Sequence, residues 1–335
     1  LAHTSSRLWL QGLDAHAEAD GSWTLFFGPA QTGLWRLTSR AIAYVPMGER
    51  FSGLPVAAAM EAPATRGPAH LFVSLGGTGL VDLARPTDST LMLRDVAGAF
   101  VRFHDSTIAA VGPRVVGFGR DGRWREPRAL AGRTLWNATP AFRAGRQEMV
   151  VALDDGLHIF TWPDGVLRRL PGDPAGPIER LSYDPVGDRL WAGRRDTFFV
   201  IALATDRTDT IAARDGLPRG PYTFARLATL TDGRRIVLVG VPGGLAVADA
   251  GAARPRFVVH DTTTLPVLPA GVLSSAAVLP DGRVVLSSGD GVAVVALGAD
   301  LAAPPRPLAV YGTGDGLLEA KVDRATPAIE PGTVW

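Results

Sequence analysis

The stretch from Thr223 to His260 reads TFARLATLTDGRRIVLVGVPGGLAVADAGAARPRFVVH, and it contains the pattern that predicts the fold. An alternating run at 223–230 is followed by an Asp-Gly hairpin signal and a dense β-branched run at 235–239. A Pro-Gly-Gly turn then leads to a third run at 245–248 and a fourth, alternating run at 256–260. The second and third runs lack polar alternation, which is typical of strands buried on both faces. The stretch therefore predicts one four-stranded antiparallel sheet.

The same unit recurs along the chain, and a glycine opens the third run of five copies. These glycines are Gly33, Gly79, Gly156, Gly244 and Gly291. The first pair is 46 residues apart and the last pair 47, and the gaps of 77 and 88 between them are each close to two periods. A period of this length, with several strands and no helix, is typical of a radial or solenoidal repeat.

The number of second strands predicts the number of repeats. They begin at Thr24, Leu71, about Thr107, Met149, Arg189, Arg235 and Arg283, with the start of another at Thr333. We therefore predict an all-β fold in which residues 1–335 form a single β-propeller of four-stranded antiparallel blades. The prediction is seven blades, or eight if the two ends pair. A parallel solenoid is the alternative, but its turns are shorter and need no fourth strand.

The two ends of the chain are expected to close the ring. An open ring would leave two unpaired sheet edges and an unburied blade face. We therefore expect the run 321–335 to lie against the run 7–13.

Composition excludes several classes of protein. The net charge is +1, with 34 basic and 33 acidic residues spread along the chain, unlike the clustered basic surface of a nucleic-acid binder. No run reaches the roughly 18 apolar residues that a membrane span needs. The absence of cysteine excludes disulfides and thiolate chemistry, and it suits an export compartment. Lys321 is the only lysine, which favours a GC-rich bacterial genome, and we expect the chain to be an excised or processed part of a longer protein.

A second motif occurs between repeats. It reads RDGLP at 214–218, GDGLL at 314–318 and, in degraded form, SGLP at 52–55, and strands such as RLWAG at 189–193 and GTVW at 332–335 accompany it. This pattern resembles the two-component regulator propeller repeat. The resemblance implies a periplasmic or extracellular sensor propeller of a bacterial hybrid histidine kinase or related regulator. In the motif, Asp-Gly forms the tight turn, Leu fills the space between blades and Trp packs on the next sheet.

Catalytic and metal-binding patterns are missing from the sequence. The six histidines show no metal-ligand spacing, and no nucleophile elbow, phosphate loop or dinucleotide fingerprint is present. His104-Asp105 is expected to be a surface hydrogen bond and His158 a packed strand residue. Asp154-Asp155 does not begin a calcium-binding ladder. We therefore expect no catalytic residues, no metal and no cofactor.

A binding site would lie on the face where turns between second and third strands meet the junctions between blades. The polar and aromatic residues expected there are Trp136, Asn137, Asp154, Arg194, Arg195, Arg219, Tyr222, Asp290, Glu319 and Lys321. Arg194, Arg195, Tyr222 and Trp136 supply bidentate donors and stacking planes without a general base. As loop residues, they are expected to contribute little to packing.

Two functions follow as hypotheses. The first is a non-catalytic extracytoplasmic sensor that binds a small polar or sugar-like ligand, or a protein partner, on this face, with no nucleic-acid binding and no membrane insertion within the segment. The alternative is a propeller enzyme, a lyase or glycoside hydrolase, acting on polysaccharide at the funnel mouth. Such an enzyme would need two carboxylates facing one cavity, or a histidine held by a partner.

Overall fold

The computed structural model describes residues 14–17, 23–28, 34–38, 42–45, 56–62, 70–75, 79–82, 91–93, 97–103, 106–111, 114–118, 123–143, 146–161, 165–174, 176–266, 272–279, 281–288, 291–311 and 324–325. The strands within these ranges form seven antiparallel sheets. In each sheet four strands pair in their order along the chain, from a first strand to a fourth, and in the first sheet a further short strand pairs with the second strand.

The first four sheets come from the N-terminal half. Their strands are β1 (Asp14–Ala17), β2 (Trp23–Gly28), β3 (Leu34–Thr38) and β4 (Ile42–Val45); β5 (Val56–Ala62), β6 (His70–Leu75), β7 (Gly79–Asp82) and β8 (Leu91–Leu93); β9 (Ala97–Phe103), β10 (Ser106–Val111), β11 (Arg114–Phe118) and β12 (Trp124–Arg125); and β13 (Leu135–Arg143), β14 (Arg146–Leu153), β15 (Gly156–Phe160) and β16 (Arg168–Arg169). A short 3-10 helix, η2 (Arg128–Leu130), joins β12 to β13.

The last three sheets follow the same plan. They contain β17 (Arg180–Asp184), β18 (Arg189–Gly193), β19 (Phe198–Ala202) and β20 (Arg207–Ile211); β21 (Ala225–Thr229), β22 (Arg235–Val241), β23 (Gly244–Asp249) and β24 (Val258–Asp261); and β25 (Leu273–Val278), β26 (Val284–Ser288), β27 (Gly291–Ala296) and β28 (Arg306–Tyr311). The 3-10 helix η3 (Ala213–Asp215) joins β20 to β21, and the two-residue strand β29 (Arg324–Ala325) ends the described chain.

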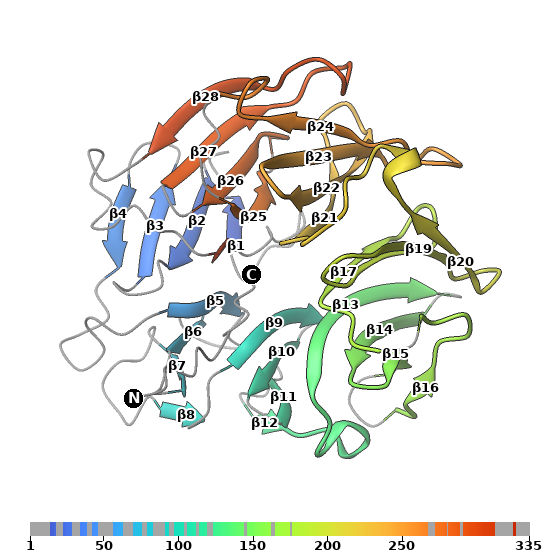
Figure 1. Ribbon diagram of the computed structural model, residues 1–335. Helices are drawn as coiled ribbons and strands as arrows, with labels where there is room; N and C mark the ends of the chain where they lie inside the picture. The colour runs from blue at the N-terminus through green and yellow to red at the C-terminus, as the bar shows by residue number, and fades with distance from the viewer. Residues whose placement is uncertain are drawn as a thin grey trace, which may run out of the picture.

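The sheets are arranged around a common centre, with the first strand of each innermost (Figure 1). The first strands contact one another in order from β1 through β5, β9, β13, β17 and β21 to β25, and β25 contacts β1. This arrangement is a β-propeller. The predicted fold class, all-β with four-stranded antiparallel sheets, is confirmed.

The predicted strands agree closely with the observed ones. β18 and β22 begin at the predicted residues, and β26 begins one residue later, at Val284. β14 begins three residues before Met149 because its hairpin with β13 is long and extends to the pair Arg143↔Arg146. The strand predicted at Thr333 lies outside the described residues.

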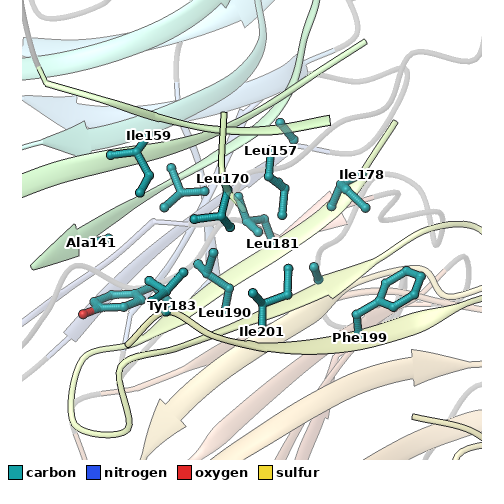
Figure 2. Packing of buried hydrophobic residues seen from close by; sticks show 14 residues of the cluster. Ala141, Leu157, Ile159, Leu170, Ile178, Leu181, Tyr183, Leu190, Phe199 and Ile201 are labelled. Atoms are coloured by element: carbon teal, nitrogen blue, oxygen red, sulfur yellow. The ribbon is translucent and has the colours of Figure 1, made fainter. Parts of the chain in front are cut away.

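Apolar residues from adjacent sheets interlock to form the core. Figure 2 shows one such layer, in which side chains of the β13–β16 sheet, such as Leu157 and Ile159, pack with Leu181, Leu190 and Ile201 of the next sheet. All five are at most 3% exposed. Burying an aliphatic side chain of this size contributes about 1.5–3 kcal/mol, so the layers between sheets supply most of the favourable free energy of folding.

The Asp-Gly-Leu motif at 215–217 has the structural role that the sequence predicts. Gly216 adopts a left-handed conformation, with φ +85°, at the end of η3. Leu217 is fully buried in a cluster that also contains Trp191. That cluster includes Val237 of the following sheet and Phe257, which directly precedes β24, so the tryptophan packs between sheets. The motif is therefore scaffold in this structure.

The C-terminal part of the chain pairs with the first sheet. β29 extends the inner edge of β2 through the pairs Phe27↔Ala325 and Gly28↔Arg324. The expected partner run, 7–13, lies outside the described residues. The observed contact therefore joins the two ends of the ring through β2.

Candidate functional site

The first strands begin at the same end of the sheets at which the turns between second and third strands lie. Arg180 at the start of β17 pairs with Gly193, which precedes the β18–β19 turn. Asn137 of β13 pairs with Ala152, two residues before the β14–β15 turn at Asp154. Both pairings follow from antiparallel geometry, in which the start of one strand faces the end of its neighbour. This end of the ring is where the sequence places the candidate residues.

Trp136 and Asp154 are joined across the sheet. The indole Nε1 of Trp136 donates a hydrogen bond of 2.7 Å to Oδ1 of Asp154, which is exposed on the β14–β15 turn. The Trp136 ring packs against the core layer between the two sheets. The pair presents one exposed carboxylate at this face, while the ring itself is partly used for packing.

Asn137 is buried and already satisfied. Its Nδ2 donates to the carbonyl of Glu179 at 2.9 Å, and its Oδ1 accepts from the backbone N–H of Ala138 at 2.8 Å. The side chain is only 3% exposed. Its amide therefore links the starts of β13 and β17 and contributes one edge of a pocket described below.

The expectation that Tyr222 presents a stacking plane is wrong. The residue is 3% exposed, its ring packs edge-on against Phe198 at 5.7 Å, and its hydroxyl donates to the carbonyl of Pro218 at 2.9 Å. Burial raises the pKa of the Tyr222 hydroxyl. The sequence places Tyr222 in a junction loop, but tertiary packing turns its ring into the core between sheets.

Arg194 also contributes to packing, against expectation. Its Nη2 donates to the carbonyl of Pro174 at 2.7 Å, and its guanidinium lies over the Phe199 ring at 5.6 Å from the centroid. Arg195 is exposed, and its carbonyl accepts a 2.9 Å hydrogen bond from the backbone N–H of Tyr222. Arg219 is exposed as well. Asp290, Glu319 and Lys321 lie outside the described residues.

A small pocket opens between the starts of four neighbouring first strands. It is lined by Asn137 of β13, by Arg180 and Leu181 of β17, by Thr223, Phe224, Ala225 and Arg226 at the start of β21, and by Ser274 and Ser275 of β25. The volume open to the centre of a water-sized sphere is about 10 Å³. That is room for roughly one water molecule or one small polar group.

Two arginines dominate the charge of the pocket. The side chain of Arg180 is 5% exposed, donates to the carbonyl of Glu179 at 3.0 Å, and lies 3.6 Å from Oε2 of the same glutamate. Burial lowers the pKa of Arg180 to about 10, against the charge of Glu179, which raises it. Burial and then the positive charge of Arg180 lower the pKa of Arg226 to about 10. Both guanidinium groups are cationic at neutral pH.

Arg180 and Arg226 were not among the residues predicted from the sequence. Each stands at the start of a first strand, among apolar neighbours such as Leu181, Ala225 and Leu227. In a strand with alternating apolar and polar residues, a charged residue is predicted to face the solvent. The sequence does contain a signal for them. The first strands of all blades surround one centre, so polar residues on the first strands of adjacent repeats come close together.

The described residues hold no group of three or more potential metal ligands. A buried histidine held by a carboxylate does occur there, because Nδ1 of His70 lies 2.6 Å from Oδ2 of Asp82. That histidine is 5% exposed and enclosed by the rings of Phe72 and Phe118. His158, another buried histidine, lies at 3.5 Å from Asp155, whose other oxygen accepts from Arg133. Neither histidine lines the pocket.

No family model matches the chain, and no curated protein is similar to it in sequence. Solved structures do match. The extracellular domain of the hybrid two-component system protein BT4673 from B. thetaiotaomicron aligns with a TM-score of 0.62 at 11% identity, over 85% of this chain and 38% of that one. The extracellular domain of BT3049 from the same organism aligns with a TM-score of 0.58 at 8% identity, over 94% and 48%.

The likeness is one of fold. A second structure of the BT4673 extracellular domain, described as a one-component system, gives a TM-score of 0.56 at 11% identity, over 85% of this chain and 40% of that one. The chain therefore spans less than half the length of these solved structures. Among the described residues, no helix is long and apolar enough to cross a membrane.

Proposed function

We propose that this chain is a non-catalytic, extracytoplasmic ligand-binding propeller of a bacterial signalling protein, built as a closed ring of seven blades. The observation that carries the proposal is the pocket at the start of the first strands, where a cationic side chain lies without a partner among the described residues. The similarity in fold to extracellular domains of two-component systems supports a sensor role. The Asp-Gly-Leu repeats support the same class of protein.

The ring of seven is supported by the contacts between first strands. β25 of the last sheet contacts β1 of the first sheet directly, and β29 pairs with β2 of the first sheet. An eighth blade would have to separate β25 from β1. We therefore propose that the C-terminal segment completes the first blade.

A sensor role is favoured over turnover by the chemistry of the pocket. Its described lining supplies guanidinium, hydroxyl and amide groups but no carboxylate or histidine. A glycoside hydrolase needs a pair of carboxylates at the reacting bond, and a lyase needs a base beside its substrate. The lining therefore suits recognition of a polar ligand.

The test is a binding screen combined with an activity assay. The 335-residue chain is screened by thermal shift against neutral sugars, acidic sugars, small carboxylates and peptidoglycan fragments, and each compound that raises the melting temperature is confirmed by calorimetry. The same compounds, and polysaccharides that contain them, are incubated with the chain and analysed by chromatography. We expect binding without product formation. Product formation, or no binding in any class, would contradict the proposal.

A further inference from the structure

Arg226 carries a positive charge that no described residue neutralises. Its Nε is buried without a hydrogen-bond partner, and no hydrogen bond or ion pair joins its guanidinium to any other residue in the described part of the chain. Arg226 is half-buried, and its Nε has lost contact with water. A guanidinium group that loses water contacts is stable in proteins when they are replaced by an ion pair or hydrogen bonds. The unpaired state of Arg226 thus points to a partner that binds from outside the chain.

The hydroxyl of Thr223 also lacks a hydrogen-bond partner among the described residues. Its Oγ1 is buried, and Thr223 lines the same pocket as Arg226. Gly240 packs closely against it, since a Cβ on Gly240 would lie 2.0 Å from this oxygen. The hydroxyl is therefore held in place and available to donate to a group in the pocket.

The charge balance selects the class of ligand. Among the described residues, the guanidinium groups of Arg180 and Arg226 stand against one neighbouring carboxylate, that of Glu179, and this part of the lining therefore carries one net positive charge. One positive charge matches a monoanion, whereas a phosphate at neutral pH carries closer to two charges. The small volume of the pocket, about 10 Å³, admits a single small group.

We propose that this pocket binds the carboxylate group of a small ligand, with the guanidinium of Arg226 and the hydroxyl of Thr223 as donors and the body of the ligand at the mouth of the pocket. The inference rests on the proposed function and names its ligand class. Uronic acids and small organic acids share this group. An arginine suits it because its planar fork donates two parallel hydrogen bonds to a carboxylate.

The experiment measures binding by calorimetry with four probes on the 335-residue chain. Sodium glucuronate and sodium acetate carry the carboxylate on a sugar and on a minimal body, the methyl ester of glucuronate lacks the charge, and inorganic phosphate is the alternative anion. We expect glucuronate, acetate or both to bind, and the ester and phosphate to bind at least about tenfold more weakly. Comparison of glucuronate with acetate distinguishes a uronic acid from a small organic acid as the source of the carboxylate.

The variants are Arg226→Met, which keeps the apolar stem, Arg226→Lys, which keeps the charge, and Arg207→Gln as a matched control. Arg207 is an exposed arginine of β20 whose partner is Asp209, so its replacement changes the net charge equally, away from the pocket. We expect Arg226→Met to weaken carboxylate binding about tenfold or more, Arg226→Lys to weaken it less, and Arg207→Gln to leave it unchanged. The melting temperature of ligand-free Arg226→Met should equal or exceed that of the wild type, because a half-buried charge with no partner among the described residues has been removed.

Each contrary outcome has a distinct meaning. If a neutral sugar binds equally well to wild type and Arg226→Met, the sensor proposal stands and the carboxylate assignment is overturned. A lower melting temperature or loss of folding in Arg226→Met overturns the assignment too, because it shows a structural arginine. If no probe and no compound of the wider screen binds, both proposals fall.

Discussion

The carboxylate of Asp184 accepts hydrogen bonds from the guanidinium of Arg235 and thereby ties the end of β17 to the start of β22 in the next sheet. The Asp184 side chain is fully buried, whereas that of Arg235 is 18% exposed. The same carboxylate also accepts from the backbone N–H groups of Val186 and Gly187, each at 3.1 Å. One side chain thus holds both a hairpin turn and the contact between two blades.

Replacing Asp184 with alanine should therefore be strongly destabilising. The change removes a buried charge and leaves a guanidinium and two N–H groups without their acceptor, which we expect to cost about 3 kcal/mol. Urea unfolding measures it. Asp209→Ala removes an exposed aspartate whose arginine partner is also exposed, and it should cost less than about 1 kcal/mol. Equal losses in the two variants would contradict the role of Asp184.

Gly216→Ala tests the turn of the Asp-Gly-Leu motif. A Cβ there would lie 2.1 Å from the carbonyl oxygen of Phe257, and φ is +85°. Gly233 is the matched control, because its φ is +80° and a Cβ would meet nothing within 4 Å. Gly233→Ala should cost about 1–2 kcal/mol from backbone strain alone, and Gly216→Ala clearly more. Thermal unfolding of the two variants side by side would show whether the close contact matters, since equal shifts would mean that it does not.

Arg194→Ala and Arg195→Ala should differ although the residues are neighbours. Arg194 loses a hydrogen bond to Pro174 and its position over the Phe199 ring, which we expect to cost about 1–2 kcal/mol. Arg195 uses only its backbone carbonyl, so its truncation should stay within about 0.5 kcal/mol. Chemical denaturation measures the free energy of unfolding of each single variant. If both variants are as stable as the wild type, the packing role of Arg194 is contradicted.

His260 should make stability depend on pH. The residue is 1% exposed, and its Nε2 lies 3.0 Å from the carbonyl oxygen of Leu301. Burial lowers its pKa below the ordinary 6.5, although that contact and the charge of Asp261 oppose the shift. The unfolded chain therefore binds the proton at higher pH than the folded chain, and the free energy of unfolding contributed by His260 falls as the pH drops below about 6.5.

The variant His260→Gln checks this dependence, because the glutamine amide can still donate to the Leu301 carbonyl but does not titrate. Urea unfolding at neutral and mildly acidic pH should show a smaller loss of stability on acidification in the variant than in the wild type. Parallel curves for the two proteins would show that another group is responsible.

Deleting residues 320–335 should lower the melting temperature, since the deletion removes β29 and its pairing with β2. Breaking that pairing leaves the inner edge of β2 open beyond β1. Differential scanning calorimetry of the full and shortened chains measures the effect. An unchanged melting temperature would show that the C-terminal segment does not close the ring.

The local pattern of the sequence was sufficient for the fold, because each part of a blade has a signal of short range. The Asp232-Gly233 hairpin, the apolar runs that follow it and the glycine at 244 predict strands that the structure places at β21 to β24. A strand's period of two and a turn's need for positive φ act between near neighbours. The repeat then determines that the copies must pack on one another.

Only the tertiary structure decided which side chains line the pocket and which lie in the core. Tyr222 is buried against Phe198, and Arg226 lies beside Arg180. These partners are 24 and 46 residues away in sequence, on other sheets. Alternation along a strand separates two faces, but it does not tell which face meets the core, the pocket or the solvent. That choice depends on how neighbouring blades pack, and burial between them is what places Tyr222 in the core and Arg226 at the pocket.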